Sequence, residues 1–171
     1  MKTWHTLTLA LLGWGLQFLP AQKVGYVDTQ ALLERMPEYK AAEQEIERLT
    51  QQWQKEVDDI YARVEQLFQQ YREQEPLMSP DMKRRKQDEI EAEERKAREL
   101  QRKRFGPNGD LFKQREEKMK PILDRLNQAI QAVAQEKKFS IVLDRSAGGN
   151  ILYAEPGYDL TDAVAVKLGL R

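Results

Sequence analysis

Residues 37–138 carry apolar side chains at helical spacing over most of their length, and this pattern restricts the chain to an elongated helical fold. In the first half of the segment the apolar positions recur about every 3.5 residues, which is typical of a helix with one apolar stripe. Such a helix would be about 50 to 65 Å long. The apolar positions are Tyr39, Ala42, Ile46, Leu49, Trp53, Val57, Ile60, Val64, Leu67 and Tyr71.

A turn is predicted near residues 75–80. Pro76 cannot continue the first helix, and Ser79 followed by Pro80 is a typical start for a second one. The second helix runs through a strongly charged stretch and returns beside the first, so we expect an antiparallel hairpin. Its last part has a denser apolar stripe, which predicts a base that is better packed than the tip. That stripe contains Leu111, Phe112, Met119, Ile122, Leu123, Leu126, Ile130 and Val133.

The returning helix is expected to break at residues 105–109, whose sequence is Phe-Gly-Pro-Asn-Gly. Pro107 removes a backbone donor, and Gly106 and Gly109 allow positive φ angles. Helical periodicity resumes at once after Gly109. The break is therefore predicted to be a short loop or bulge within the hairpin, without a domain boundary.

The segments 23–36 and 139–171 are predicted to form a small cap at the base of the hairpin. Short β-type runs occur at 23–28, 139–144 and 151–154, and a last helix follows and ends at Gly169. The fold class is therefore mainly α with a small β cap, an α+β fold in which a long helical hairpin stands on a three-stranded β element.

The cap is too small to form a useful core by itself, and this predicts self-association. Its strands carry apolar side chains that other surfaces must cover, and a symmetric oligomer would cover them and close the sheet edges. We therefore expect a homo-oligomer that is joined at the caps, with the arms projecting. The residues expected in this oligomer body are Val24, Tyr26, Val27, Ile141, Leu143, Ile151 and Leu152.

Composition excludes several classes of function. The chain has 28 basic and 28 acidic residues, no Cys and one His, which is His5. A near-neutral chain is not a general nucleic-acid binder, and the usual zinc ligands are missing. No nucleotide-binding or nucleophile motif occurs. We therefore predict no metal, no cofactor and no enzyme activity, since no carboxylate is isolated in an apolar pattern that would shift its pKa.

Residues 1–22 are expected to be a cleaved export signal. Lys2 is followed by an apolar run from Leu7 to Leu19, and Ala21 is a small residue suited to the position before the cut. The alternative is an uncleaved anchor, although the run is short for a membrane span. In both cases the body faces an extracytoplasmic space, which we take to be the periplasm.

The tip of the hairpin offers two candidate contact features. Leu77, Met78 and Met82 are apolar and flexible, so they either cover the end of the hairpin or contact a partner. A basic cluster follows at Lys83, Arg84, Arg85 and Lys86. It is either a solvated helix face or a contact for anionic lipid headgroups or acidic polypeptide.

Five short motifs follow one another along the chain in a fixed order. They are V-G-Y-V-D at Val24–Asp28, M-P-E-Y-K at Met36–Lys40, Pro121 with the later A-I-Q-A-V-A-Q-E run, F-S-I-V-L-D at 139–144, and D-L-T-D-A-V at Asp159–Val164. With the order of a leader, a strand, a long helical hairpin, a strand pair and a terminal helix, the chain resembles the Skp/OmpH family of periplasmic chaperones for outer-membrane proteins. The resemblance implies a jellyfish-shaped trimer, whose β body is built from three chains and whose helical arms enclose an unfolded outer-membrane protein without using ATP.

Passive holding is the mechanism we infer, in which amphipathic helices shield an unfolded β-barrel strand by many weak contacts. Trp53 and Tyr71 would alternatively pack inside the seam of the hairpin. An envelope scaffold or adaptor that docks a membrane complex through the tips is the rival function. The candidate contacts for the unfolded client protein are Trp53, Phe68, Tyr71, Leu77 and Met78.

Overall fold

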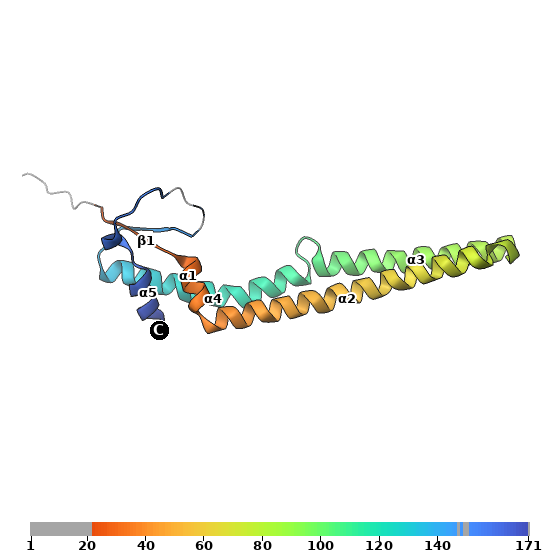
Figure 1. Ribbon diagram of the computed structural model, residues 1–171, viewed down its shortest axis with the longest axis horizontal. Helices are drawn as coiled ribbons and strands as arrows, with labels where there is room; N and C mark the ends of the chain where they lie inside the picture. Colours follow the sequence, from red (N-terminus) through yellow and green to blue (C-terminus); the bar gives the residue numbers. More distant parts are fainter. Residues whose placement is uncertain (1–21, 147, 149–150, 171) are drawn as a thin grey trace, which may run out of the picture.

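The computed structural model describes residues 22–146, 148 and 151–170, so the predicted signal at residues 1–22 lies outside this part except for Gln22. A long helical arm projects from a small cap (Figure 1). The elements in chain order are β1 (Val24–Val27), α1 (Thr29–Arg35), α2 (Pro37–Gln74), a 3₁₀ turn (Glu75–Leu77), α3 (Pro80–Phe105), α4 (Asp110–Glu136), β2 (Ile141–Asp144), a second 3₁₀ turn (Pro156–Tyr158) and α5 (Thr161–Leu168).

The arm is a hairpin in which α2 runs out from the cap and α3 and α4 return beside it (Figure 1). Helix α2 has 38 residues, which corresponds to about 57 Å. The chain turns between Gln74 and Pro80, where the prolines and Ser79 predicted a turn. The Ser79 side chain accepts a hydrogen bond from the backbone N–H of Met82 at 3.3 Å and so caps α3. No helix in the described ranges is both long and apolar enough to cross a membrane.

The returning helix is interrupted at 106–109, where the sequence predicted a loop. The loop bulges away from α2 (Figure 1), but its backbone differs from the expectation. Gly106 and Gly109 have negative φ angles, and Asn108 takes the positive one at 57°. The glycines serve close approach instead, because a Cβ atom at Gly106 would lie 2.3 Å from the carbonyl oxygen of Arg102.

The sheet of the cap has two parallel strands, β1 and β2, in which Val24 pairs with Ile141 and Val27 with Asp144. The third strand predicted at 151–154 is not formed in this chain. At the other edge of β1, Tyr26 instead forms an isolated bridge with Asp159, and the N–H of Leu160 donates to the carbonyl of Tyr26 at 2.8 Å. The segment just before α5 therefore occupies part of the edge that a third strand would need.

The main core lies where the cap meets the arm and is built mostly from helices. It joins α1, the end of α4 and α5 beneath the sheet, which agrees with the predicted contrast between base and tip. Farther out, α2 buries single residues one or two turns apart, and α3 buries only Ile90 and Ala97. The core cluster contains Val27, Leu32, Leu33, Met36, Ile122, Leu126, Ala129, Val133, Phe139, Leu160, Val164, Ala165 and Leu168.

Candidate functional site

The sheet of the cap leaves an apolar surface uncovered. Val24, Ile141 and Leu143 are exposed, and Leu152, on the loop that follows β2, is 98% exposed. Beside them lies a groove of about 370 Å³, lined mainly by Val24, Tyr26, Leu143, Ile151, Tyr153 and Tyr158. A small cap with this much uncovered apolar surface is suited to association with another surface.

The predicted oligomer-body residues divide into two groups. Tyr26 and Val27 are buried within their own chain, because the core covers Val27 and the Arg145 guanidinium lies 5.5 Å from the centre of the Tyr26 ring. Val27 therefore belongs to the core of its own chain, whereas Tyr26 presents only a small exposed part of its side chain to the groove. The surface that remains open consists of Val24, Ile141, Leu143 and Leu152, with Ile151 half-buried beside them.

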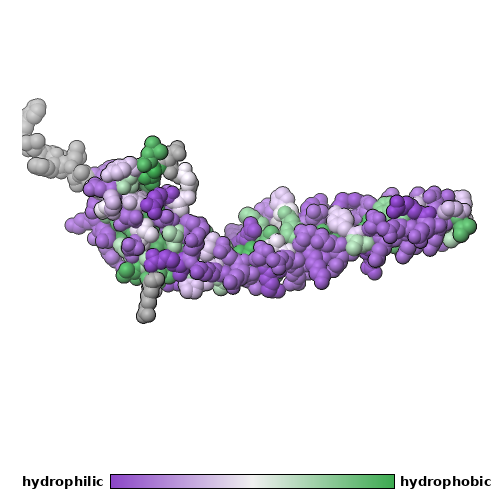
Figure 2. Space-filling view, in the orientation of Figure 1, coloured by the Kyte–Doolittle hydropathy of each residue, from purple (hydrophilic) through white to green (hydrophobic). Residues whose placement is uncertain are grey.

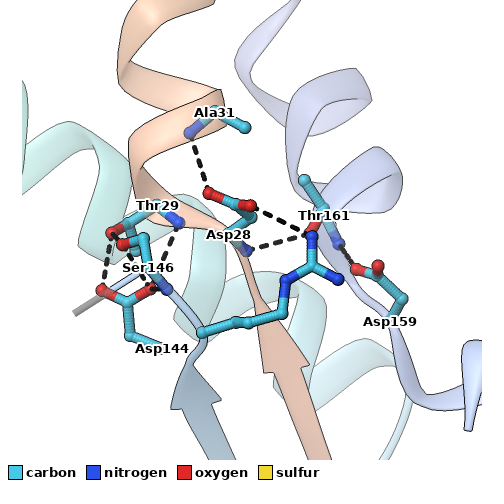
Figure 3. A network of polar contacts seen from close by, with 8 residues as sticks. Asp28, Thr29, Ala31, Asp144, Ser146, Asp159 and Thr161 are labelled. Carbon is cyan, nitrogen blue, oxygen red and sulfur yellow. Dashed lines mark hydrogen bonds and ion pairs between the residues drawn. The ribbon is translucent and has the colours of Figure 1, made fainter. Parts of the chain in front are cut away.

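A polar network fixes the end of β1 (Figure 3). Asp28 caps α1 by accepting a hydrogen bond from the N–H of Ala31 at 2.9 Å, and it also accepts one from Arg145 at 3.0 Å. Both bonds favour the carboxylate and hold the pKa of Asp28 below its usual value. The backbone N–H of Asp28 donates to the Thr161 hydroxyl at 3.0 Å, which ties α5 to the same point.

A second carboxylate, Asp144, occupies the matching end of β2 (Figure 3). It accepts hydrogen bonds from the Thr29 hydroxyl at 2.6 Å and from the Ser146 hydroxyl at 2.8 Å. Burial alone would raise the pKa of Asp144, but these hydroxyl donors and the N–H groups of Thr29 and Ser146 outweigh it, and the pKa is lowered. Sequence reasoning missed this network, although an Asp at the end of each strand, followed within two residues by Thr29 or Ser146, was a signal that the sequence offered.

The network has no feature of a catalytic or metal centre. Its carboxylates are occupied by donors of the same chain, and their pKa values move away from the range of a general base at neutral pH. Nowhere in the part of the chain that the structure describes do three His, Cys, Asp or Glu side chains gather in a way that could hold a metal. The network therefore positions the sheet against α1 and α5.

Trp53 lies in the seam of the arm, the alternative that the sequence left open. It is 7% exposed, and the guanidinium carbon of Arg104 lies 4.8 Å from the centre of its ring. Tyr71 is half-buried, and its hydroxyl accepts a hydrogen bond from Gln87 at 3.0 Å, so it also belongs to the contact between α2 and α3. Neither side chain is freely presented on the surface of the arm.

The apolar side chains that the arm does expose include two of the predicted contacts and two residues of α4. Phe68 and Leu77 from the predicted contacts are exposed, whereas Met78 is half-buried at the tip. Phe112 and Leu123, which the periodicity assigned to the packed stripe of α4, are also exposed. They are eleven residues apart and so share one face of α4. Figure 2 shows a mainly hydrophilic arm with isolated green areas.

The basic cluster behind the tip is only partly free. Lys83 pairs with Glu75 at 3.3 Å, and Lys86 pairs with Glu89 at 2.8 Å. Arg84 and Arg85 are exposed beside them. The cluster thus presents two exposed guanidinium groups near the exposed Leu77 and Met82.

A model of the OmpH-like outer membrane protein family matches residues 23–168, from the residue before β1 to the last residue of α5. The chain belongs to the OmpH-like family. No curated protein matches the sequence. A crystal structure from Caulobacter crescentus CB15, described as a candidate outer membrane chaperone (OmpH-like), matches this OmpH-like chain with a TM-score of 0.69 and 18% identity, over 98% of this chain and 89% of that one. At this identity the likeness concerns the fold.

Proposed function

We propose that this OmpH-like chain is an ATP-independent periplasmic holdase chaperone. It binds unfolded outer-membrane β-barrel proteins between its helical arms and prevents their aggregation. Family membership supports a chaperone role. The observation that carries the proposal further is the pairing of a long arm bearing scattered exposed apolar side chains with a cap that has an uncovered apolar face.

The proposed assembly is a homotrimer joined through the caps. The uncovered side chains Val24, Ile141, Leu143 and Leu152 would be buried against neighbouring copies of the chain. A specific interface buries about 800 Å² on each partner. Burial of apolar surface contributes about 25 cal/mol per Å² of that area. Such an assembly would also hide the unpaired edge of β2, which otherwise invites aggregation.

The proposed mechanism is holding by many weak contacts. An unfolded β-barrel segment exposes aliphatic and aromatic groups, and Phe68, Phe112, Leu123 and Leu77 would meet them at widely separated points of the arm. Each contact is small, so the client keeps moving and is released when folding into the bilayer becomes more favourable. Neither ATP nor any other cofactor is part of this mechanism.

The decisive experiment is an aggregation assay with an unfolded β-barrel protein diluted from urea, run beside a mass measurement of the purified chain. We expect a mass of three chains and suppression of light scattering at about one trimer per client. Phe112→Ser with Leu123→Ser should weaken the suppression, whereas Gln114→Ser with Gln128→Ser on the same helix should not. A well-folded monomer at high concentration would refute the assembly, since the apolar face of the cap would then need no cover.

An envelope scaffold remains the alternative, and the same material distinguishes it from a chaperone. A scaffold binds one defined folded partner, whereas a holdase protects many unfolded clients. Capture of a single folded protein, together with no protection of the unfolded barrel, would favour the scaffold.

We also propose that the tip makes transient contact with anionic membrane surfaces through Arg84 and Arg85. A basic side chain near an anionic surface contributes about 1 kcal/mol, so two of them give a weak, salt-dependent contact. Flotation with vesicles of anionic and zwitterionic lipids tests it. Arg84→Glu with Arg85→Glu should abolish binding to anionic vesicles. The matched charge reversal Arg95→Glu with Arg98→Glu, farther down the arm, should retain it, and equal loss in both variants would contradict a contact at the tip.

A further inference from the structure

The middle of the arm combines one continuous helix with one interrupted helix. Helix α2 passes the level of the break without interruption, while α3 ends at Phe105 and α4 begins at Asp110. At such a point only one helix resists bending through its own hydrogen bonds. The arm would therefore bend here easily unless side chains held the three helices together.

Arg104 is the side chain at which the three helices meet. Its Nη2 atom pairs with Glu56 of α2 at 2.9 Å, and its Nη1 atom pairs with Asp110 of α4 at 2.7 Å. The guanidinium also lies over the ring of Trp53, which is buried in α2. One residue of α3 thus holds α2 by two contacts and α4 by one.

The environment of Arg104 differs from that of the other arginines on the arm. Its side chain is only 23% exposed, whereas the side chains of Arg98 and Arg95, which pair with glutamates of their own helix, are mostly exposed. Exposed ion pairs within one helix add little stability. Burial alone would lower the pKa of Arg104, but its bonds to Asp110 and Glu56 raise it, so the charge is retained.

Arginine suits this position for a physical reason. Its planar guanidinium donates to two carboxylates in different directions while its face stacks on an aromatic ring, which a lysine ammonium cannot do. The buried Nε atom of Arg104 has no hydrogen-bond partner. A buried donor without a partner costs free energy. The stack on Trp53 and the two ion pairs must therefore offset this cost to hold the Arg104 side chain in its observed conformation.

The loop at 106–109 is folded tightly against the last turn of α3, which carries Arg104. The N–H of Gly106 donates to the carbonyl of Arg102, and the N–H of Gly109 donates to the carbonyl of Gly106, both at 2.8 Å. Gly109 is buried, and a Cβ atom there would lie 2.8 Å from the carbonyl oxygen of Lys103. The loop is therefore compact in the structure, and Asp110, directly after it, lies beside Arg104.

We propose that Arg104 is a staple that makes the break a rigid joint. It fixes the outer half of the arm, formed by α3 and the facing part of α2, at a set angle to the inner half formed by α4. Arg104 is a positioning residue in this proposal: it acts by holding Trp53, Glu56 and Asp110 in place. The proposal concerns the geometry of the arm and holds whether or not the chain is a chaperone.

The absence of cysteine from the chain makes a direct distance measurement possible. Spin labels would be placed on Gln70→Cys beyond the break and on Gln128→Cys at the base, both exposed positions in helices. Labelled full-length chain would be mixed with excess unlabelled chain, so that pulsed electron resonance reports distances within one chain. Hydrogen exchange at Gly106 and Gly109 would be followed in parallel.

We expect a single narrow distance distribution for the labelled protein. Arg104→Gln should broaden the distribution and remove the exchange protection of the Gly106 and Gly109 amides. Arg102→Gln is the matched control, because it makes the same charge change on an exposed side chain of the same helix. It should leave the distance distribution narrow and the exchange slow.

Two further variants keep the test decisive if Arg104→Gln loses helical structure. Arg104→Lys keeps the charge but cannot bridge both carboxylates, so it should also broaden the distribution. Glu56→Gln with Asp110→Asn keeps the size of both side chains and should do the same. A folded Arg104→Lys protein with a distribution as narrow as that of the unsubstituted chain would overturn the staple, as would slow exchange at both glycines in every variant.

Discussion

Leu126→Ala tests whether the stability of this protein resides in the core where the cap meets the arm. Leu126 is 2% exposed and lies in the cluster that joins α1, α4 and α5. The substitution removes three carbon atoms, which corresponds to about 2.4 kcal/mol of transfer free energy at about 0.8 kcal/mol per group. The cavity left in a packed core adds to this, so we expect a loss of about 3 to 4 kcal/mol.

The matched control is Leu123→Ala, on the same helix and three residues earlier. Leu123 is 42% exposed, so much of its apolar surface contacts solvent before the substitution and its removal leaves no closed cavity. We expect a loss of less than about 1 kcal/mol. The two variants make the same chemical change with the same helix propensities, so their difference reports burial alone.

Urea unfolding followed by the helical circular dichroism signal would measure both variants. The protein concentration must be the same in each titration, because self-association adds to the apparent stability. The midpoint should fall strongly for Leu126→Ala and slightly for Leu123→Ala, with little change in slope. Equal small losses would refute the reasoning, because the base of the arm would then not be the cooperative core.

Three further predictions follow from single sites. The lowered pKa values of Asp28 and Asp144 mean that the unfolded chain binds more protons than the folded chain in acid. The stabilisation by these two carboxylates is therefore complete above about pH 5 and is lost as the pH falls below about 4. The unfolding midpoint measured as a function of pH tests this, and a midpoint that does not change with pH would contradict it. Ser79→Ala should cost about 1 kcal/mol of local stability and speed hydrogen exchange only in the first turn of α3. Gly25→Ala should lower the free energy of unfolding by about 1 to 3 kcal/mol, because its Cβ would lie 2.9 Å from the Phe139 ring in the core, and an unchanged unfolding midpoint would show that the ring can move aside.

The arm could be predicted from the sequence because the residues that determine its helices and its turn are close together in the sequence. A stripe with helical period, a proline that stops one helix and a Ser-Pro pair that starts the next act within a few residues of each other. Ser79 therefore forms the cap that its position predicted. The family resemblance was readable for a similar reason, since short motifs in a fixed order extend over nearly the whole chain, and the family match over residues 23–168 confirms it.

The features that the sequence did not predict depend on contacts between distant residues. Residues 151–154 have the composition of a strand, but pairing along β1 is decided by Asp159, which forms the bridge to Tyr26. Phe112 has the right spacing for the packed stripe, yet it is exposed on α4. Arg104 looks like any charged residue of the arm, and only the fold brings it to Glu56, which is 48 positions away.

Stability in this molecule should decline from the base of the arm to its tip. The base shares the core of the cap, the middle is held by Trp53 and Arg104, and the outer half depends on isolated buried residues such as Ile90 and on ion pairs within single helices. Local opening costs least where buried contacts are fewest, so the tip should exchange its amide hydrogens first and the base last. In the proposed chaperone, an unfolded client could then widen the outer arms at small cost, while the caps that hold the chains together stay intact.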